Sequence, residues 1–232
     1  RGADVLLHDD APRERLAARL DALDDRVEVS CGQPFVGRAG DLVVISPGLP
    51  PHSETFRRAR SLGSGLLSEV ELFLRLDRAR PGGHDRPLVA ITGTDGKTTT
   101  TLWTAALLEA AGMEVVVGGN IGTPLVELLG GLGPRAVLVA EISAFQLHTT
   151  HSLRPRASVL TNVAEDHLDW FGGDFAAYAA TKRALARHQG AGDTVIYKAG
   201  DPALLGAVPA TARGVPFGQD GDAVGDAPDA LW

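Results

Sequence analysis

Short apolar runs alternate with helical patterns along most of the 232-residue chain. Each run is nearly continuous in Val, Ile, Leu and Ala, as expected for strands buried on both faces of a parallel sheet. The predicted strands are residues 4–9, 41–48, 87–93, 113–120, 136–143, 157–163 and 193–200. Apolar residues recur at helical spacing in residues 12–23, 53–63, 68–79, 97–112 and 174–190. This alternation predicts an α/β fold built on mostly parallel sheets.

The polar segment over residues 78–87 divides the chain into two parts. It contains two prolines and two glycines, a composition typical of a linker. We therefore expect a partial Rossmann-like layer over residues 1–80 and a second α/β domain over residues 87–232. The tail from Val208 to Trp232 shows no clear periodicity, and the pattern assigns no element to it.

Composition and charge narrow the class of protein. A net charge of −7 argues against a nucleic-acid-binding protein, which carries a basic face. The single cysteine, Cys31, excludes an internal disulfide and suits a reducing cytosol, so a cytoplasmic location is expected. No apolar run reaches the ~20 residues of a membrane span, and we expect no membrane association. Because the sequence starts at Arg1 rather than at methionine, we expect it to be part of a longer protein.

The most specific motif is a glycine loop between a predicted strand and a predicted helix. Its residues are Gly93, Thr94, Asp95, Gly96, Lys97, Thr98 and Thr99. In such a loop the backbone N–H groups face an anion, Lys97 adds a positive charge and the Thr98 hydroxyl can ligate Mg²⁺. The full phosphate-loop pattern has glycine five positions before Gly96, where Ile91 stands. The alternative is a turn capped by threonines, but the strand before and the helix after favour a phosphate loop.

Polar side chains also stand at the ends of other predicted strands. Glu141 ends an apolar run, at the edge where ligands bind in open α/β sheets. Its carboxylate suits Mg²⁺, although a solvated strand-end acid is the alternative. Further residues in similar positions are candidates for ligand contacts or for turn and capping roles: Asp9, Asp10, Ser46, Pro47, Gly48, Asn120, Ser143 and Gln146. By pattern alone, His167 is an ordinary surface or core histidine and Lys182 an ordinary helix-surface lysine.

Several segments, in order, resemble the Mur ligase family, whose members add amino acids to the peptidoglycan precursor. Five of them are TGTDGKTT (92–99), GGNIGTPL (118–125), AEISAFQL (140–147), LTNVAEDHLDW (160–170) and YAATKRAL (178–185). The form EISAFQL is similar to that of the D-glutamate-adding branch and differs from the other branches. Upstream, SPGLPPHS (46–53) and LLSEVELF (66–73) resemble the N-terminal domain of the same branch.

The resemblance implies a phosphate-loop central domain and an ATP-dependent amide ligase. The implied reaction adds D-glutamate to UDP-N-acetylmuramoyl-L-alanine through an acyl phosphate, with ATP and two Mg²⁺ ions as cofactors. A monomer is expected. The alternatives are another Mur-type or folylpolyglutamate ligase, and a nucleotide-binding module without ligase activity.

The resemblance also implies roles for particular residues. Lys97, His167 and Lys182 would be catalytic, and Thr98 and Glu141 would hold the first Mg²⁺. His167 and a carbamylated Lys182 would hold the second Mg²⁺. The muramoyl-peptide or phosphates would contact Asn120, Ser143 and Gln146, and the UDP end would contact Asp9, Asp10, Ser46, Pro47 and Gly48.

The sequence departs from the family pattern in four ways. The family's first strand and nucleotide loop would precede Arg1, and its third domain would follow the tail. The central domain is also expected to be incomplete at its end. Ala144 stands where the family commonly has a second serine.

Overall fold

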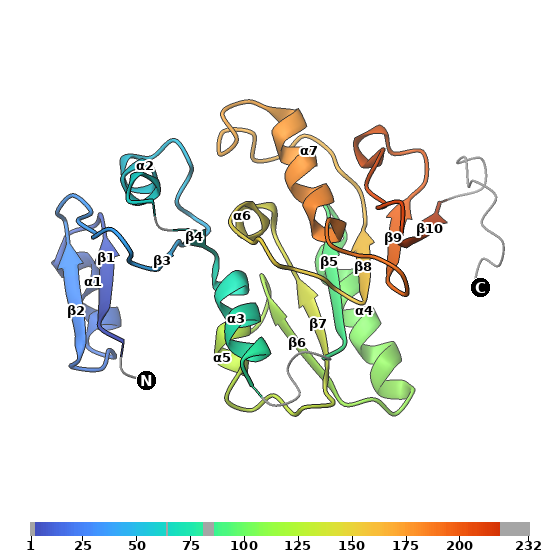
Figure 1. Ribbon diagram of the computed structural model, residues 1–232, viewed down its shortest axis with the longest axis horizontal. Helices are drawn as coiled ribbons and strands as arrows, with labels where there is room; N and C mark the ends of the chain where they lie inside the picture. Colours follow the sequence, from blue (N-terminus) through green and yellow to red (C-terminus); the bar gives the residue numbers. More distant parts are fainter. Residues whose placement is uncertain (1–2, 64, 81–85, 219–232) are drawn as a thin grey trace. The chain divides into compact units, whose positions relative to one another are not determined.

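The computed structural model describes the residues in three ranges: 3–63, 65–80 and 86–218. The chain divides into two compact units: Arg1–Val43 with Leu49–Leu66, and Val44–Gly48 with Leu67–Trp232. Strands alternate with helices in each unit (Figure 1), which confirms the predicted α/β class. No helix in the described ranges is both long and apolar enough to cross a membrane.

The first unit is a small parallel layer. Strand β1 (Val5–Asp9) pairs in parallel with β2 (Val27–Cys31), and helix α1 (Arg13–Leu20) connects them. Helix α2 (Glu54–Ser61) follows later in the chain and is capped by the Ser53 hydroxyl. Since parallel strands end at the same edge, the β1 and β2 ends bring their following loops together.

Helix α3 (Glu69–Arg78) belongs to the second unit. It follows β4 (Leu66–Leu67), which pairs with β3 (Val43–Val44) where the chain passes between the two units. The apolar face of α3 is buried in the core of the second unit. The domain boundary predicted within residues 81–86 stays a prediction, because residues 81–85 lie outside the described ranges.

The second unit is built on a six-stranded sheet with the order β10-β9-β8-β5-β7-β6, and all of its strand pairs are parallel. The strands are β5 (Leu88–Thr92), β6 (Val115–Gly119), β7 (Val137–Glu141), β8 (Ala157–Leu160), β9 (Thr194–Lys198) and β10 (Arg213–Phe217). The first strand along the chain, β5, lies between β7 and β8. Loops after these three neighbouring strands therefore meet at one edge of the sheet, where open α/β sheets bind ligands.

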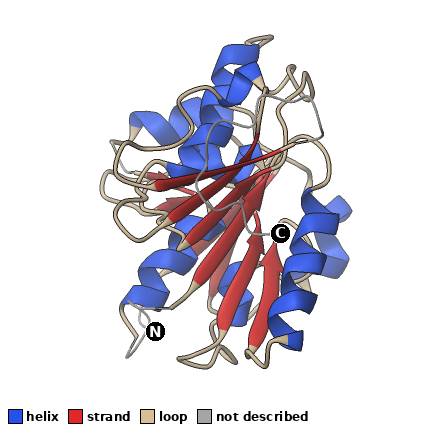
Figure 2. Ribbon diagram, turned by 90° about the vertical axis from the view of Figure 1, so that its right-hand side faces the viewer, coloured by secondary structure: helices blue, strands red, loops and turns tan. Residues whose placement is uncertain are grey.

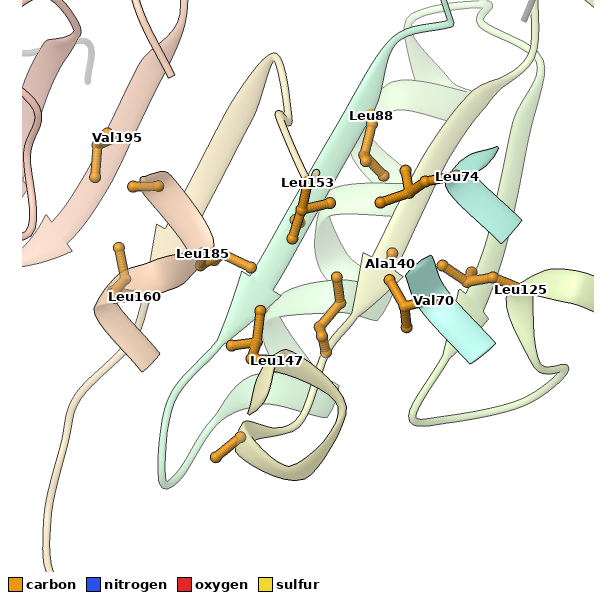
Figure 3. Close-up of a cluster of buried hydrophobic side chains, with 14 of the residues drawn as sticks. Val70, Leu74, Leu88, Leu125, Ala140, Leu147, Leu153, Leu160, Leu185 and Val195 are labelled. Atoms are coloured by element: carbon orange, nitrogen blue, oxygen red, sulfur yellow. The ribbon is translucent and has the colours of Figure 1, made fainter. Parts of the chain in front are cut away.

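Helices cover both faces of this sheet (Figure 2). Helix α4 (Lys97–Ala110) packs through Ala105 on the face that carries Ile91 and Val139. The other helices are α3, α5 (Leu125–Leu128), α6 (Ala144–His148) and α7 (Phe175–Arg183), and they pack on the opposite face. Figure 3 shows side chains of α3, α5 and α6 together with side chains of the strands in one apolar cluster. Because successive strand residues point to opposite faces, a continuous apolar strand contributes side chains to the apolar clusters on both faces of the sheet.

The predicted elements are confirmed with shorter bounds, and the structure adds several more. The unpredicted elements are β2, β4, β10, α5, α6 and a 3₁₀ turn at Pro202–Leu204, whereas the 3₁₀ turn at Ala184–Ala186 lies within the helix predicted over residues 174–190. Strand β10 lies in the tail, to which the sequence pattern assigned no element. Residues 219–232 of the tail lie outside the described ranges.

Candidate functional site

The glycine loop leaves β5 and enters α4 through two positions that favour glycine. Gly93 has a φ of 156°, and a Cβ added there would stand 1.8 Å from Thr161 Oγ1. Gly96 has a φ of 77° and is the N-cap of α4. The loop thereby leads directly into the N-terminus of α4, whose first N–H groups carry the partial positive charge that a phosphate site requires.

The loop is braced by the segment that follows β8. The Asn162 side chain accepts a hydrogen bond from the Asp95 N–H (3.0 Å) and donates one to the Asp95 carbonyl (3.1 Å). The Thr161 hydroxyl donates to the same carbonyl (2.6 Å). The Thr94 hydroxyl donates to the Ala164 carbonyl (3.1 Å). Thr161 and Asn162 were missed by sequence reasoning, because their partners are distant along the chain.

Lys97 is the first residue of α4 and places its ammonium group back over the loop. Its Nζ donates to the Thr94 carbonyl (2.7 Å). The cation is therefore held beside the N–H groups of the helix N-terminus rather than extended into solvent. Backbone donors and a fixed ammonium group are the groups that a polyphosphate site requires.

Glu141 joins two other loops at the same edge of the sheet. It ends β7, is 1% exposed, and accepts hydrogen bonds from Thr98 Oγ1 (2.8 Å) and Asn120 Nδ2 (2.8 Å). None of the ion pairs among the described residues involves Glu141. A buried carboxylate beside a hydroxyl, with no cationic side chain as partner, fits a bound Mg²⁺ ion.

Close approach of two strands makes this arrangement possible. Gly119 has a φ of 106°, and a Cβ there would stand 2.3 Å from the Glu141 carbonyl oxygen. The N–H of Asn120 instead donates to that oxygen at 2.7 Å. The glycine therefore lets the Asn120 amide reach the Glu141 carboxylate.

Lys182 is buried, contrary to the helix-surface position that its sequence pattern suggests. It is 2% exposed, its Nζ donates to the Gly93 carbonyl (2.6 Å), and the same atom lies 4.6 Å from the centre of the Tyr178 ring. Burial, followed by the nearby charge of Lys97, lowers the pKa of Lys182 to about 7. The Tyr178 hydroxyl lies 3.2 Å from Thr94 Oγ1, so α7 contacts the glycine loop at two points.

The free energy of unfolding is expected to rise with pH above about 7. Unfolded Lys182 keeps its proton up to its ordinary pKa of 10.5, whereas the buried amine releases it near 7. Below pH 7 both states hold the proton, and folding bears the full cost of burying the charge. Between pH 6.5 and 9.5 the parent should therefore gain up to about 3 kcal/mol of unfolding free energy relative to Lys182→Met. Urea denaturation in CO₂-free buffer measures it; a pH-independent difference contradicts the expectation.

His167 occupies a strained backbone position near the loop. Its φ is 48°, and among the described residues it is the one non-glycine residue with a positive φ. Its imidazole lies 3.4 Å from Asp166 Oδ2 and 5.3 Å, centre to centre, from the Phe145 ring. The described part of the chain contains no group of three His, Cys, Asp or Glu residues able to hold a metal. A metal here would need phosphate or water oxygens among its ligands.

Ser143 and Gln146 form the capping box of α6. Ser143 Oγ accepts from the Gln146 N–H (3.2 Å), and Gln146 Oε1 accepts from the Ser143 N–H (3.0 Å). Gln146 is 4% exposed, and its Nε2 donates to Glu69 Oε1 (3.2 Å). Both side chains thus have the capping role that the sequence left open, and substrate contact by either stays a prediction.

The first unit has its own pocket at the end of β1. Both carboxylate oxygens of Asp10 accept from the Thr55 hydroxyl (2.8 and 3.0 Å), and hydrogen bonds from His8 and then Thr55 lower the pKa of Asp10. A cavity of about 320 Å³ is lined by Asp10, Gly32, Gln33, Pro34, Phe35, Glu54, Thr55 and Arg58. Asp9 accepts from the Ala11 N–H (2.8 Å) and so shapes the turn after β1.

The remaining predicted contacts lie elsewhere. Ser46, Pro47 and Gly48 follow β3 in the segment that belongs to the second unit. A further cavity of about 380 Å³, not anticipated from the sequence, lies after β9 and is lined by residues between Tyr197 and Val208. Asp201 in its wall accepts from the Val163 N–H (2.8 Å), which ties this cavity to the loop after β8.

The strand, glycine loop and helix define the second unit as a phosphate-loop α/β domain. Residues 91–227 match the Mur ligase middle domain. A relative in Frankia casuarinae named UDP-N-acetylmuramoylalanine–D-glutamate ligase is 43% identical over 226 residues, which are 95% of this chain and 45% of that protein. A relative of the same name in Pelotomaculum thermopropionicum is 41% identical over 205 residues, 87% of this chain and 43% of that protein. The chain spans less than half the length of these relatives.

Solved structures agree on the fold. MurF ligase from Thermotoga maritima in complex with ADP matches with a TM-score of 0.55 and 24% identity, over 79% of this chain and 48% of that chain. The UDP-N-acetylmuramate:L-alanyl-gamma-D-glutamyl-meso-diaminopimelate ligase from Neisseria meningitides matches with a TM-score of 0.54 and 20% identity, over 94% of this chain and 71% of that chain. The chain belongs to the Mur ligase family.

Proposed function

We propose that the complete protein is an ATP-dependent ligase that adds D-glutamate to UDP-N-acetylmuramoyl-L-alanine in peptidoglycan precursor synthesis. The observation that carries this proposal is the hydrogen bond from Thr98, in the Gly93–Thr99 segment, to the Glu141 carboxylate. It brings the proposed phosphate-binding loop next to the proposed metal-binding carboxylate. The names of the relatives that are 41–43% identical supply the two substrates. A cytoplasmic location and a monomeric state stay predictions.

The reaction proposed for this site has two steps. The carboxylate of UDP-N-acetylmuramoyl-L-alanine attacks the γ-phosphate of ATP, which gives an acyl phosphate and ADP. The amine of D-glutamate then attacks the acyl carbon, loses a proton and displaces phosphate. Because a carboxylate and a triphosphate repel each other, the site must concentrate positive charge on the transferred group. Lys97 and the N–H groups of α4 supply part of that charge.

Residues of the chain fit a first Mg²⁺ ion, and two more are proposed to hold a second. Thr98 and Glu141 would hold the first ion, which would neutralise phosphate charge. His167 and Lys182 would hold the second. Lys182 would first react as a neutral amine with CO₂, forming an N–C bond and releasing a proton. The burial of Lys182 supports this role, and the carbamate would keep an N–H able to donate to the Gly93 carbonyl.

The UDP end of the substrate is proposed to bind in the Asp10 pocket of the first unit. A carboxylate beside a strand end can accept hydrogen bonds from a ribose or a uracil, and the Phe35 ring in the same wall offers a stacking surface. Asp9, Ser46, Pro47 and Gly48 stay predictions as further contacts.

Phosphate release tests the proposal. The product of the complete gene, with Mg²⁺–ATP and UDP-N-acetylmuramoyl-L-alanine, should release phosphate with D-glutamate and not with L-lysine or diaminopimelate. The Lys97→Met variant of the same protein gives the background rate. Release with L-lysine or diaminopimelate would reassign the protein to a sister ligase. No release with any amino acid would favour a nucleotide-binding module without ligase activity.

A further inference from the structure

The Glu69 carboxylate connects two segments of the second unit that lie far apart in the sequence. Glu69 is the first residue of α3 and is half-buried. One oxygen, Oε1, accepts from Gln146 Nε2 in α6 (3.2 Å), and the other, Oε2, accepts from the Val126 N–H in α5 (3.3 Å). Burial raises the pKa of Glu69, whereas these hydrogen bonds act in the opposite direction.

The first arm of this connection ends on the turn that follows Glu141. The oxygen of the Gln146 amide is occupied by the N–H and the hydroxyl of Ser143 (3.0 and 3.1 Å). Its NH₂ group is therefore turned toward Glu69, and the amide is held from both ends. Ser143 stands two residues after Glu141, so Glu69 holds the exit of β7 in place.

The second arm ends on the loop that carries Asn120. That loop runs from β6 to α5 and is closed by the Gly119 N–H, which donates to the Thr123 carbonyl (3.0 Å). Holding the N-terminus of α5 fixes one end of the loop, and the Asn120 amide at the other end donates to Glu141 Oε1 (2.8 Å). The two hydrogen bonds that Glu69 accepts thus come from segments attached to the two loops that meet at Glu141.

We propose that Glu69 is a positioning residue for the proposed Mg²⁺–nucleotide site. It sets the distance between the loop after β6 and the turn after β7, and thereby the orientation of Glu141 toward Thr98. The inference rests on the proposed function for its ligand, while the connection itself is a property of the folded chain. Residues that orient metal ligands typically change metal affinity by about 10- to 100-fold when they are replaced.

Glu69→Gln and Glu71→Gln form a matched pair for the test. Glutamine has the shape of glutamate but places an NH₂ group where one of the two carboxylate oxygens stood. Because Gln146 and Val126 donate to different oxygens of Glu69, glutamine in the same position can accept from one of them and not from both. Glu71 lies on the same helix and is 1% exposed, but it accepts from the His151 and Ser152 N–H groups (2.9 Å each). Each variant removes one acceptor charge from α3, and of the two residues only Glu69 contacts the loops at Glu141.

Amide hydrogen exchange of the chain without nucleotide is the first measurement. Glu69→Gln should accelerate exchange at residues 119–126 and 142–147, and Glu71→Gln should accelerate it near residues 150–153 instead. Unchanged exchange in both of the first segments, or the same pattern in the two variants, would overturn the inference. The thermal midpoints of both variants show that each is folded.

Binding of ADP at increasing Mg²⁺ concentration is the second measurement. Glu69→Gln should weaken the Mg²⁺-dependent affinity by about 10-fold and leave binding in EDTA unchanged, whereas Glu71→Gln should change either by less than about 2-fold. Equal losses in the two variants would mean that Glu69 acts through stability alone. If the product of the complete gene binds no Mg²⁺–ADP, the proposed function fails, and hydrogen exchange still decides whether Glu69 joins the two loops.

Discussion

Replacing Lys97 with methionine is expected to weaken Mg²⁺–ADP binding by about 10- to 150-fold, because a charge-assisted hydrogen bond contributes roughly 1.5–3 kcal/mol. The ammonium group is already held over the loop by the Thr94 carbonyl (2.7 Å), so little ordering is needed when a phosphate binds. Methionine keeps the length and the apolar stem of the side chain. The thermal midpoint should therefore change by less than about 3 °C. Isothermal titration of the 232-residue chain measures the affinity.

Arg187→Met is the matched control for the charge. Arg187 is an exposed cation of the second unit, and its removal lowers the net charge by the same amount. A distant exposed charge is screened by salt, so the Mg²⁺–ADP affinity of the control should fall by less than about 2-fold at 0.15 M salt. Equal affinities of the parent and Lys97→Met would show that the loop is not the phosphate site.

Replacing Gly93 with alanine is expected to destabilise the second unit by about 3 kcal/mol or more and to lower the thermal midpoint by about 6–12 °C. The added Cβ would stand 1.8 Å from Thr161 Oγ1 and 3.2 Å from the Asn162 carbonyl oxygen. Moving Thr161 aside would break its hydrogen bond to the Asp95 carbonyl (2.6 Å). The φ of 156° adds backbone strain for any residue with a Cβ. Differential scanning calorimetry measures the change.

Two other glycines separate steric overlap from backbone strain. Gly96 has a φ of 77°, and no atom lies within 4 Å of the position that a Cβ would take, so Gly96→Ala should cost about 1–2 kcal/mol from strain alone. Gly130 has neither a positive φ nor a close neighbour, so Gly130→Ala should change stability by less than about 1 kcal/mol. If all three substitutions had the same effect, the contact with Thr161 would be irrelevant to the loop.

The central strands of the second unit were predictable because a central parallel strand is apolar along nearly its whole length. Residues 137–141 are buried at all five positions, and the same run stands out in the sequence. The two missed longer strands lack that signal. Strand β2 alternates apolar residues with Glu28 and Ser30, and β10 contains Gly214 and Pro216, which disfavour a strand in an interior position but are tolerated at an edge.

The site was predictable where its residues are neighbours in the sequence. The glycine loop and its helix form one local motif, and their geometry is as expected from the pattern. The burial of Lys182 was not predictable from residues alone, because helix α7 is covered by parts of the chain that the local pattern does not contain. The same holds for Glu69, whose partners lie 57 and 77 residues away.

The brace behind the glycine loop has a consequence for the order of events during synthesis of the chain. Thr161 lies 66 residues after Asp95, the residue whose carbonyl it holds. At 5–20 residues per second, a ribosome adds that stretch in roughly 3–13 seconds. During this interval the nascent loop lacks the partners that give it its shape. The loop therefore acquires its folded shape only after β8 has been made and has paired with β5.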